Sequence, residues 1–245
     1  MIFIPLNYKM IIKVLKDNNE IGRVASDLIV QEIVRKPNLL LCTATGETPT
    51  NTYTKLVDKK ELYPTDQIRI LKLDEWGGVP MIDPMTCEYY LQKFILKPLN
   101  ISQKNYFGFN SNSTNPEKEI QRMKSILIEQ GPIDICVLGL GMNGHIAFNE
   151  PPCDPNEECR IAKLSASSLL HPMAIQMGVT PEYGLTLGIK EIMQSKKIIM
   201  LINGAHKKKI AKEFISGQIS ATIPASYLWL HPDVNCFMDE SANSI

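Results

Sequence analysis

The hydrophobic and polar positions of this chain follow two alternating patterns. Short apolar runs of strand length are separated by segments in which apolar residues recur at helical spacing, as in residues 21–35. Strands that alternate with helices in this way are typical of a mostly parallel sheet. The strand-like runs lie at residues 39–43, 68–73, 133–138 and 197–202, with a further one near 235–238. The other helical segments lie around residues 85–96, 117–129 and 208–215.

These elements form one series without an internal repeat, a low-complexity tract or a dividing linker. A chain of 245 residues can bury a substantial core as one unit. We therefore predict a single α/β domain over residues 1–245, with a doubly wound, mostly parallel, Rossmann-like sheet and helices on both faces. Such sheets bind ligands at the carboxyl ends of their strands. Four predicted strands end in polar, glycine-bearing turns, so we expect the site there.

The turn after the strand at 133–138 has the strongest chemical character. Residues 137–151 combine an imidazole, His145, and a carboxylate, Glu150, with three glycines that let the backbone approach a substrate closely. A histidine in a loop is more often structural than catalytic. Here the glycines, the preceding strand, Asn143 and Glu150 favour catalysis by His145, with Glu150 orienting the imidazole or biasing its charge.

The turn after the first strand suits a phosphate. Thr45, Gly46 and Thr48 offer hydroxyls and backbone N–H groups where a helix begins, and helix N-termini bind anions. The alternative is a simple helix start, in which Thr48 caps the helix and Pro49 takes its first position. The usual P-loop and dinucleotide fingerprints are missing, which disfavours ATP and NAD.

Cationic residues elsewhere offer fewer clear candidates. Lys207 follows the fourth strand and could neutralise a phosphate in the same crevice. The alternative is a solvated helix face, which runs of lysine such as residues 207–209 usually form. His171, His206 and His231 have no polar company in the sequence, and we expect them on the surface or at helix ends.

A pair of adjacent carboxylates follows the second strand. Asp74 and Glu75 point to opposite faces if the strand continues regularly, so at most one of them enters the pocket. A carboxylate followed by residues 76–78, Trp-Gly-Gly, is a credible general base because apolar surroundings raise its pKa toward the working pH. A role in capping a helix is the alternative.

Composition excludes several classes of protein. The 26 basic and 26 acidic side chains cancel, so no global field attracts nucleic acid or anionic lipid. The six cysteines show no C-x-x-C spacing, which indicates reduced core thiols and neither zinc nor a disulfide framework. We infer no signal peptide and no membrane span, and we expect a cytoplasmic location.

Three motifs together resemble a known family. They are Thr-Gly-Glu-Thr-Pro at residues 45–49, Leu-Asp-Glu-Trp at 73–76 and Gly-Met-Asn-Gly-His-Ile-Ala-Phe-Asn-Glu-Pro at 141–151. The chain resembles, over residues 39–211, the glucosamine-6-phosphate deaminase and isomerase family. Relatives of that family include galactosamine-6-phosphate isomerases and 6-phosphogluconolactonases. The third motif is highly specific.

The resemblance implies a role for each candidate residue. Asp74 would remove the C2 proton of a hexosamine 6-phosphate, and His145 would open the sugar ring with support from Asn143 and Glu150. The 6-phosphate would be held by Thr45, Gly46, Thr48 and Lys207. One carboxylate and one histidine suffice for this chemistry, so no metal or cofactor is implied. Homo-oligomers are the usual state of such enzymes, and we therefore expect a homo-oligomer.

Departures from the family pattern bear on the substrate. Asn143 stands where several family deaminases carry Asp, and an amide can orient His145 but cannot stabilise an imidazolium by charge. Trp76 replaces a typical Tyr, Glu47 replaces a typical Gly, and residues 164–178 lack an expected phosphate-assisting arginine. This pattern resembles the galactosamine branch, which implies conversion of galactosamine 6-phosphate to tagatose 6-phosphate and ammonia.

Three alternatives stay open. Glucosamine 6-phosphate, giving fructose 6-phosphate, differs from the favoured substrate only at C4. A 6-phosphogluconolactonase would resemble Asp-Glu-Arg and Gly-His-Thr-Ala-Ser-Leu-Phe-Pro where this chain has Trp76 and residues 146–151. A non-catalytic sugar-phosphate sensor would need a DNA-binding segment, for which the residues before the first helix leave no room.

Overall fold

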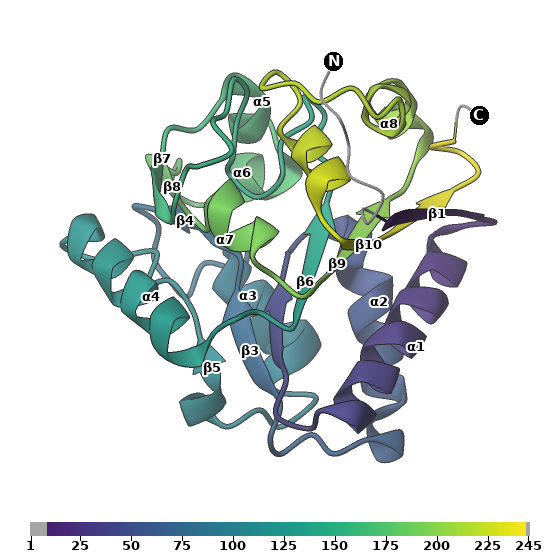
Figure 1. The fold of residues 1–245 in the computed structure, drawn as a ribbon. Helices are drawn as coiled ribbons and strands as arrows, with labels where there is room; N and C mark the ends of the chain where they lie inside the picture. Colours follow the sequence, from purple (N-terminus) through teal and green to yellow (C-terminus); the bar gives the residue numbers. More distant parts are fainter. Residues whose placement is uncertain (1–8, 244–245) are drawn as a thin grey trace.

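The core of the molecule is a seven-stranded parallel sheet. The computed structural model describes residues 9–243, and every hydrogen-bonded strand pair of this sheet is parallel (Figure 1). The predicted α/β architecture is confirmed, whereas the two edge strands were not predicted. Across the sheet the order is β1 (Lys9–Leu15), β10 (Asp233–Asp239), β9 (Lys197–Ile202), β6 (Ile135–Gly139), β2 (Leu40–Thr43), β3 (Arg69–Lys72) and β5 (Tyr106–Phe107).

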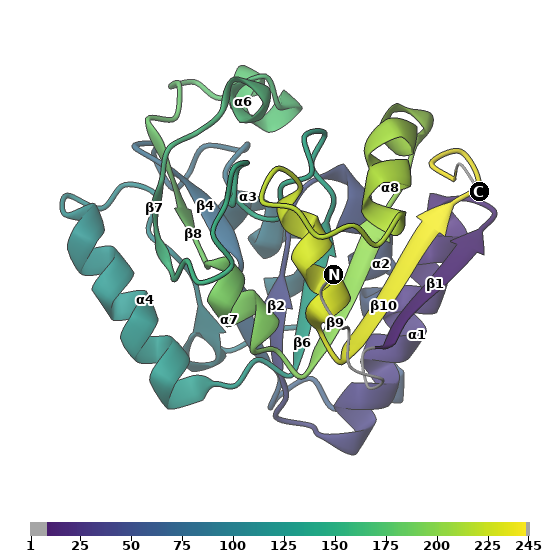
Figure 2. The same cartoon turned by 45° about the horizontal axis from the view of Figure 1, so that its top comes forward.

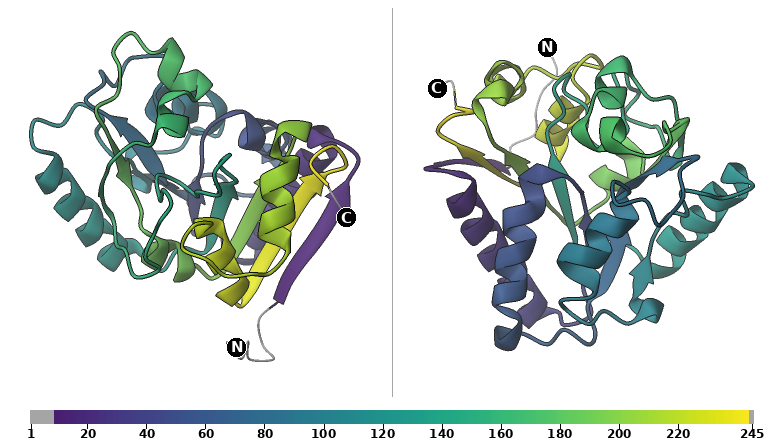
Figure 3. Two further views of the ribbon diagram at one scale, coloured as in Figure 1. Left: turned by 90° about the horizontal axis from the view of Figure 1, so that it is seen from above. Right: turned by 180° about the vertical axis from the view of Figure 1, so that it is seen from behind.

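Helices cover both faces of this sheet, as Figures 2 and 3 show. The predicted helix at 85–96 is divided, because its second half is wound as a π-helix, Gln92–Leu96. None of the described helices is long and apolar enough to cross a membrane. One face carries α1 (Asn18–Arg35), α2 (Glu47–Asp58) and α3 (Cys87–Leu91). The other carries α4 (Pro116–Gln130), α7 (Ile189–Met193), α8 (Lys208–Ile215) and the 3-10 segment Pro224–Leu230. Shorter 3-10 turns lie at Lys60–Leu62, Gln103–Asn105 and Ala205–Lys207.

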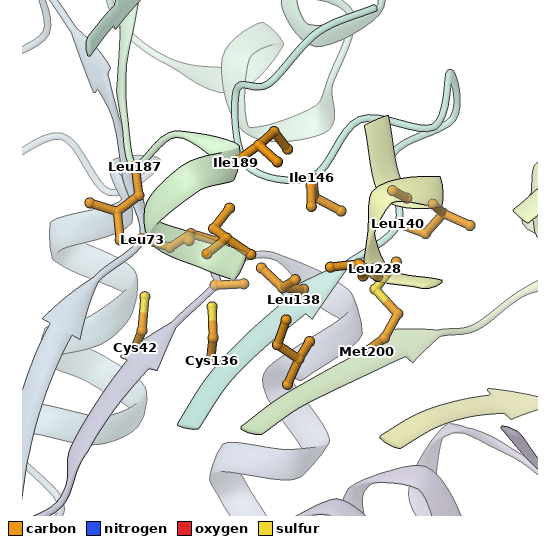
Figure 4. Packing of buried hydrophobic residues seen from close by; sticks show 14 of the residues in the cluster. Cys42, Leu73, Cys136, Leu138, Leu140, Ile146, Leu187, Ile189, Met200 and Leu228 are labelled. Atoms are coloured by element: carbon orange, nitrogen blue, oxygen red, sulfur yellow. The ribbon is translucent and has the colours of Figure 1, made fainter. Parts of the chain in front are cut away.

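Each central strand is apolar on both sides because both of its faces are covered. In β6, Val137 packs with the helices α1 and α2, whereas Cys136 and Leu138 pack on the opposite face. Figure 4 shows this second cluster, in which Cys42 and Met200 from the neighbouring strands lie beside them. All six cysteines are buried free thiols, as predicted. Near-continuous apolar strands of this kind are what a parallel sheet requires.

A second, three-stranded antiparallel sheet stands beside the first. The segment predicted as a turn after the second strand is in fact the strand β4 (Asp74–Gly77), which pairs with β8 (Tyr183–Thr186). The third strand is β7 (Arg160–Ala162). This sheet shares the main core through Leu185 and Leu187. Two short helices, α5 (Ala166–Leu169) and α6 (Pro172–Gln176), follow β7 and lie near the carboxyl ends of the main strands (Figure 1).

Asp134 joins the two strands at the centre of the main sheet. Its carboxylate accepts the Leu40 N–H at 2.8 Å and ammonium hydrogen bonds from Lys36 and Lys196 at 2.6 to 2.9 Å. Burial acts to raise the pKa of Asp134, but these donors outweigh it and the pKa ends below its ordinary value. The charged carboxylate therefore stabilises the start of β6 against β2.

We expect Asp134→Asn to lower the free energy of unfolding by about 1–3 kcal/mol at pH 7, since it removes the charge on which the buried Leu40 N–H and two lysine ammonium groups converge. A lowered pKa stabilises the fold above the ordinary value near 4, and this contribution is lost as the pH falls through the lowered pKa. The difference in free energy of unfolding between the wild-type protein and Asp134→Asn, measured by urea unfolding, should therefore be smaller at about pH 3 than at pH 7. Exposed Asp66→Asn is the control, and equal losses in the two variants would contradict the prediction.

Candidate active site

A cavity of about 350 Å³ opens at the carboxyl ends of the main strands. The turns after β2, β3, β6 and β9 all contribute to its wall, and it lies over the β2–β6 pair. On one side of this pair the sheet continues through β3 and β5, and on the other side it continues through β9 and β10. Open α/β sheets bind ligands where the strand order reverses in this way. The predicted residues in its wall are Thr45, Gly46, Thr48, Asp74, His145 and Lys207.

Local backbone geometry explains the glycines of the loop after β6. A Cβ atom on Gly141 would lie only 2.3 Å from Cδ2 of His145, so a glycine is needed where the imidazole packs on the backbone. Gly144 has φ of +84°, a conformation that side chains disfavour. The Gly141 N–H donates to the His145 carbonyl at 2.9 Å. The tight turn thus presents the imidazole to the cavity.

The remaining two predicted residues, Asn143 and Glu150, form a polar cluster behind His145. Nδ1 of His145 lies 3.2 Å from Oε2 of Glu150, and the Asn143 amide donates to that same oxygen at 2.8 Å. Ser168 donates to Oε1 of Glu150. The Asn143 side chain supports His145 in two ways: its amide holds the Glu150 carboxylate, and its Oδ1 accepts the His145 backbone N–H at 3.3 Å.

Glu150 is held as a carboxylate. Burial acts to raise its pKa, but the hydrogen bonds and charge of His145, with those of Ser168 and Asn143, lower the pKa to about 2. The Glu150 carboxylate beside Nδ1 fixes the orientation of the imidazole. His145 is therefore equipped to carry a proton and to pass it on through its other ring nitrogen.

Asp74 and Glu75 divide between the cavity and the core, as their alternation on a strand predicts. Asp74 lines the cavity, and Glu75 is fully buried on the other side of β4. Burial and the Glu75 charge raise the pKa of Asp74 to about 7, although Lys72 acts to lower it. Such a carboxyl group is poised to accept a proton near neutral pH.

The part of the cavity wall formed by the start of α2 and by Lys207 suits an anion. Helix α2 begins after Gly46, whose φ is +107°, and no side chain caps its first turn. The expected Thr48 cap is thus wrong: Thr48 lies inside the helix and lines the cavity. Lys207 faces the same space, and burial lowers its pKa to about 8. Free helix N–H groups and an ammonium together match a phosphate.

Two of the other histidines lie at helix ends, as predicted, but in surroundings that the sequence did not indicate. His231 is buried rather than on the surface; the Asp233 N–H donates to its Nδ1, and Nε2 donates to the Ser195 carbonyl at 2.7 Å. His171 lines the cavity from the start of α6, with its ring centroid 6.2 Å from that of Trp76. No periodic pattern marks the segments around these two histidines, so the sequence did not indicate the burial of His231 or the contact of His171 with the cavity.

The fold and the cavity define an α/β protein whose strand-end crevice is lined by acid–base groups, by an uncapped helix N-terminus and by a lysine. The chain belongs to the family of glucosamine-6-phosphate isomerases and 6-phosphogluconolactonase, whose sequence model matches residues 19–236. This is a family of enzymes.

Relatives in this family span almost the whole chain. AgaI of Escherichia coli (strain K12), named as a deaminase, is 37% identical over 217 residues, which cover 88% of this chain and 86% of AgaI. The glucosamine-6-phosphate deaminase of Clostridium acetobutylicum is 33% identical over 237 residues, covering 95% of this chain and 98% of the relative.

Solved structures agree with this assignment. A monomeric glucosamine-6-phosphate deaminase of the NagB superfamily superposes with a TM-score of 0.90 at 30% identity, covering 94% of this chain and 98% of the other. The 6-phosphogluconolactonase of Thermotoga maritima has a TM-score of 0.77 at 18% identity, with coverage of 95% and 100%, and shares the fold.

Proposed function

We propose that the protein is a hexosamine-6-phosphate deaminase that isomerises an aldose to a ketose and releases ammonia. The observation that carries this proposal is the arrangement of one cavity. A carboxyl group with a pKa of about 7, Asp74, and an imidazole backed by a permanent carboxylate, His145 with Glu150, share this cavity with an anion site. The relatives named as deaminases support the same reaction class.

The chemistry follows from these groups. His145 transfers the proton of the 1-hydroxyl to the ring oxygen, the C1–O5 bond breaks, and an aldehyde forms. Asp74 removes the C2 proton, the freed electron pair forms the C1=C2 double bond, and the aldehyde oxygen takes a proton from water, which gives an enolamine with a hydroxyl at C1. Return of a proton to C1 gives an imine at C2. Water adds to that imine and ammonia leaves, so the products are a ketose 6-phosphate and ammonia.

Galactosamine 6-phosphate is our proposed substrate, with tagatose 6-phosphate as the product. Trp76 and Glu47, which distinguish this chain from the glucosamine pattern, both line the cavity. Trp76 packs edge-on against Phe148 with ring centroids 4.6 Å apart, so the wall at this point is bulky and fixed. Glucosamine 6-phosphate is the second candidate, because relatives carrying that name are nearly as similar as AgaI.

An ammonia-release assay with both sugar phosphates in parallel tests the proposal. We expect ammonia from both and a higher kcat/KM for the galactosamine compound. Non-phosphorylated galactosamine is the control for the anion site, and 6-phosphogluconolactone is the control for the lactonase reaction. Binding of either sugar phosphate without ammonia release would contradict the deaminase and favour a sensor. A higher kcat/KM for glucosamine 6-phosphate would reverse the assignment of the substrate.

A further inference from the structure

A cluster of three buried charged side chains, Lys72, Glu75 and Glu88, lies behind β4 and does not line the cavity. The side chains of Lys72 and Glu75 have no exposed surface, and that of Glu88 is 13% exposed. Nζ of Lys72 lies 2.7 Å from Oε2 of Glu75 and 2.9 Å from Oε2 of Glu88. Tyr106 donates a further hydrogen bond to Glu88. Burial of charge at such depth is costly unless each group is paired.

Hydrogen bonds to the backbone fix the cluster in place. Oε1 of Glu75 accepts the N–H groups of Trp76 and Cys87, each at 2.9 Å, and its Oε2 accepts the Glu88 N–H at 2.8 Å. Glu75 therefore joins β4 to the start of α3. Because Asp74 precedes Glu75 on the same strand, the cluster and the candidate base share one rigid piece of backbone.

The pKa values of Lys72 and Glu88 are both shifted toward their charged forms. Burial acts to lower the pKa of Lys72, but Glu75 and Glu88 outweigh it, and the pKa ends above its ordinary value. Burial acts to raise the pKa of Glu88, but Lys72 and Tyr106 lower it below its ordinary value. One ammonium thus stands against two carboxylates on the protein side of Asp74.

Several other groups surround Asp74. Sγ of Cys87 lies 4.0 Å from its Oδ1, and the thiol is neutral because burial raises its pKa well above the ordinary value. Cys42 and Tyr53 are buried and neutral for the same reason. The cavity side carries the titratable groups Glu47, His145, His171, His206 and Lys207. Substrate and water reach that side, whereas Lys72 and Glu75 lie on the side that water does not reach.

We propose that Lys72 is a positioning residue of the deaminase, whose buried ammonium balances Glu75 and Glu88 and so sets the pH range in which Asp74 acts as the base. This inference rests on the proposed function. Without the ammonium, the Glu75 charge acts unopposed on Asp74 and favours its protonated form. Removal of a carboxylate from the cluster has the opposite effect.

Two substitutions with opposite charge effects test the inference. In Lys72→Met, the acid limb of kcat/KM against pH should move up by about one pH unit. In Glu88→Gln, which keeps the shape of a partly exposed side chain, the limb should move down. Lys190→Met is the matched control, because it removes one ammonium from an exposed ion pair with Glu158, and it should leave the limb in place.

A direct titration separates this inference from the proposed function. Carbon-13 NMR of the aspartate carboxyl groups, with the Asp74 resonance assigned from Asp74→Asn, gives the midpoint of Asp74 without any turnover. If the wild-type protein releases no ammonia, the deaminase proposal fails and this titration still decides the inference. An Asp74 midpoint that is the same in folded Glu88→Gln as in the wild-type protein would overturn the inference. A uniform loss of activity with an unmoved acid limb would also overturn it, since that result indicates a purely structural role.

Discussion

Asp74→Asn should lower kcat for ammonia release by about 1,000-fold, because it removes the base that takes the C2 proton and keeps the shape of the side chain. KM should change little, since the amide fills the same volume. The same variant should lose exchange of the substrate C2 proton with deuterium from solvent. Proton NMR of the substrate in D2O measures this exchange, and kinetics in H2O measure the turnover.

The pH dependence of kcat/KM in the wild-type protein should also report on Asp74. A base must be deprotonated to act, and the pKa of Asp74 lies near 7. The kcat/KM of the wild-type protein should therefore rise with pH and level off above about 7 on its acid side. C2 exchange that survives in Asp74→Asn would place the base elsewhere in the cavity.

Lys207→Met should lower kcat/KM for the sugar phosphate by about 100-fold, because it removes the ammonium that faces the anion end of the cavity. The loss should appear mainly in KM if the phosphate is held equally in the substrate and the transition state. Steady-state kinetics with the phosphorylated sugar measure it. Lys208→Met is the matched control, since this exposed neighbour carries the same charge and does not line the cavity.

Lys207 also predicts the alkaline side of the pH profile. Burial lowers its pKa to about 8, so its charge is present below that pH and is lost as the pH rises through it. The kcat/KM should fall above about pH 8, which together with Asp74 gives a bell-shaped profile. In Lys207→Met this alkaline decline should disappear. Its persistence would show that another group, such as the substrate amine, controls that limb.

The sequence was sufficient for the parts of the fold that follow a strong hydrophobic pattern. β2, β3, β6 and β9 are buried on both faces, and runs rich in apolar residues identify them, although Arg69 and Lys72 interrupt the run of β3. β4 has no such run, since its residues are Asp-Glu-Trp-Gly, and pairing with β8 makes it a strand. A long-range partner of this kind leaves no local signal.

The candidate site shows the same division. All eight predicted residues come from segments directly after predicted strands, which are short-range features, and the structure places six of them in the cavity wall and two behind His145. The environment of His171 depends on how the segment after β7 folds back over the cavity, and a linear pattern does not encode this. Cys87 and Ser168 likewise enter the site only through tertiary contacts. The run of lysines left two alternatives for Lys207, a solvated helix face or a place in the crevice, and the structure places it in the cavity wall.

The pairing of β4 with β8 carries a consequence for how this protein tolerates change. Asp74 lies opposite Thr186 and Glu75 lies opposite Leu185. Successive side chains of a strand point to opposite faces, so a slip of one residue would turn Glu75 toward the cavity and bury Asp74 on the side of Lys72. Insertions or deletions of a single residue in β4 or β8 are therefore more damaging than many substitutions, because they exchange two carboxylates that differ in length by one methylene.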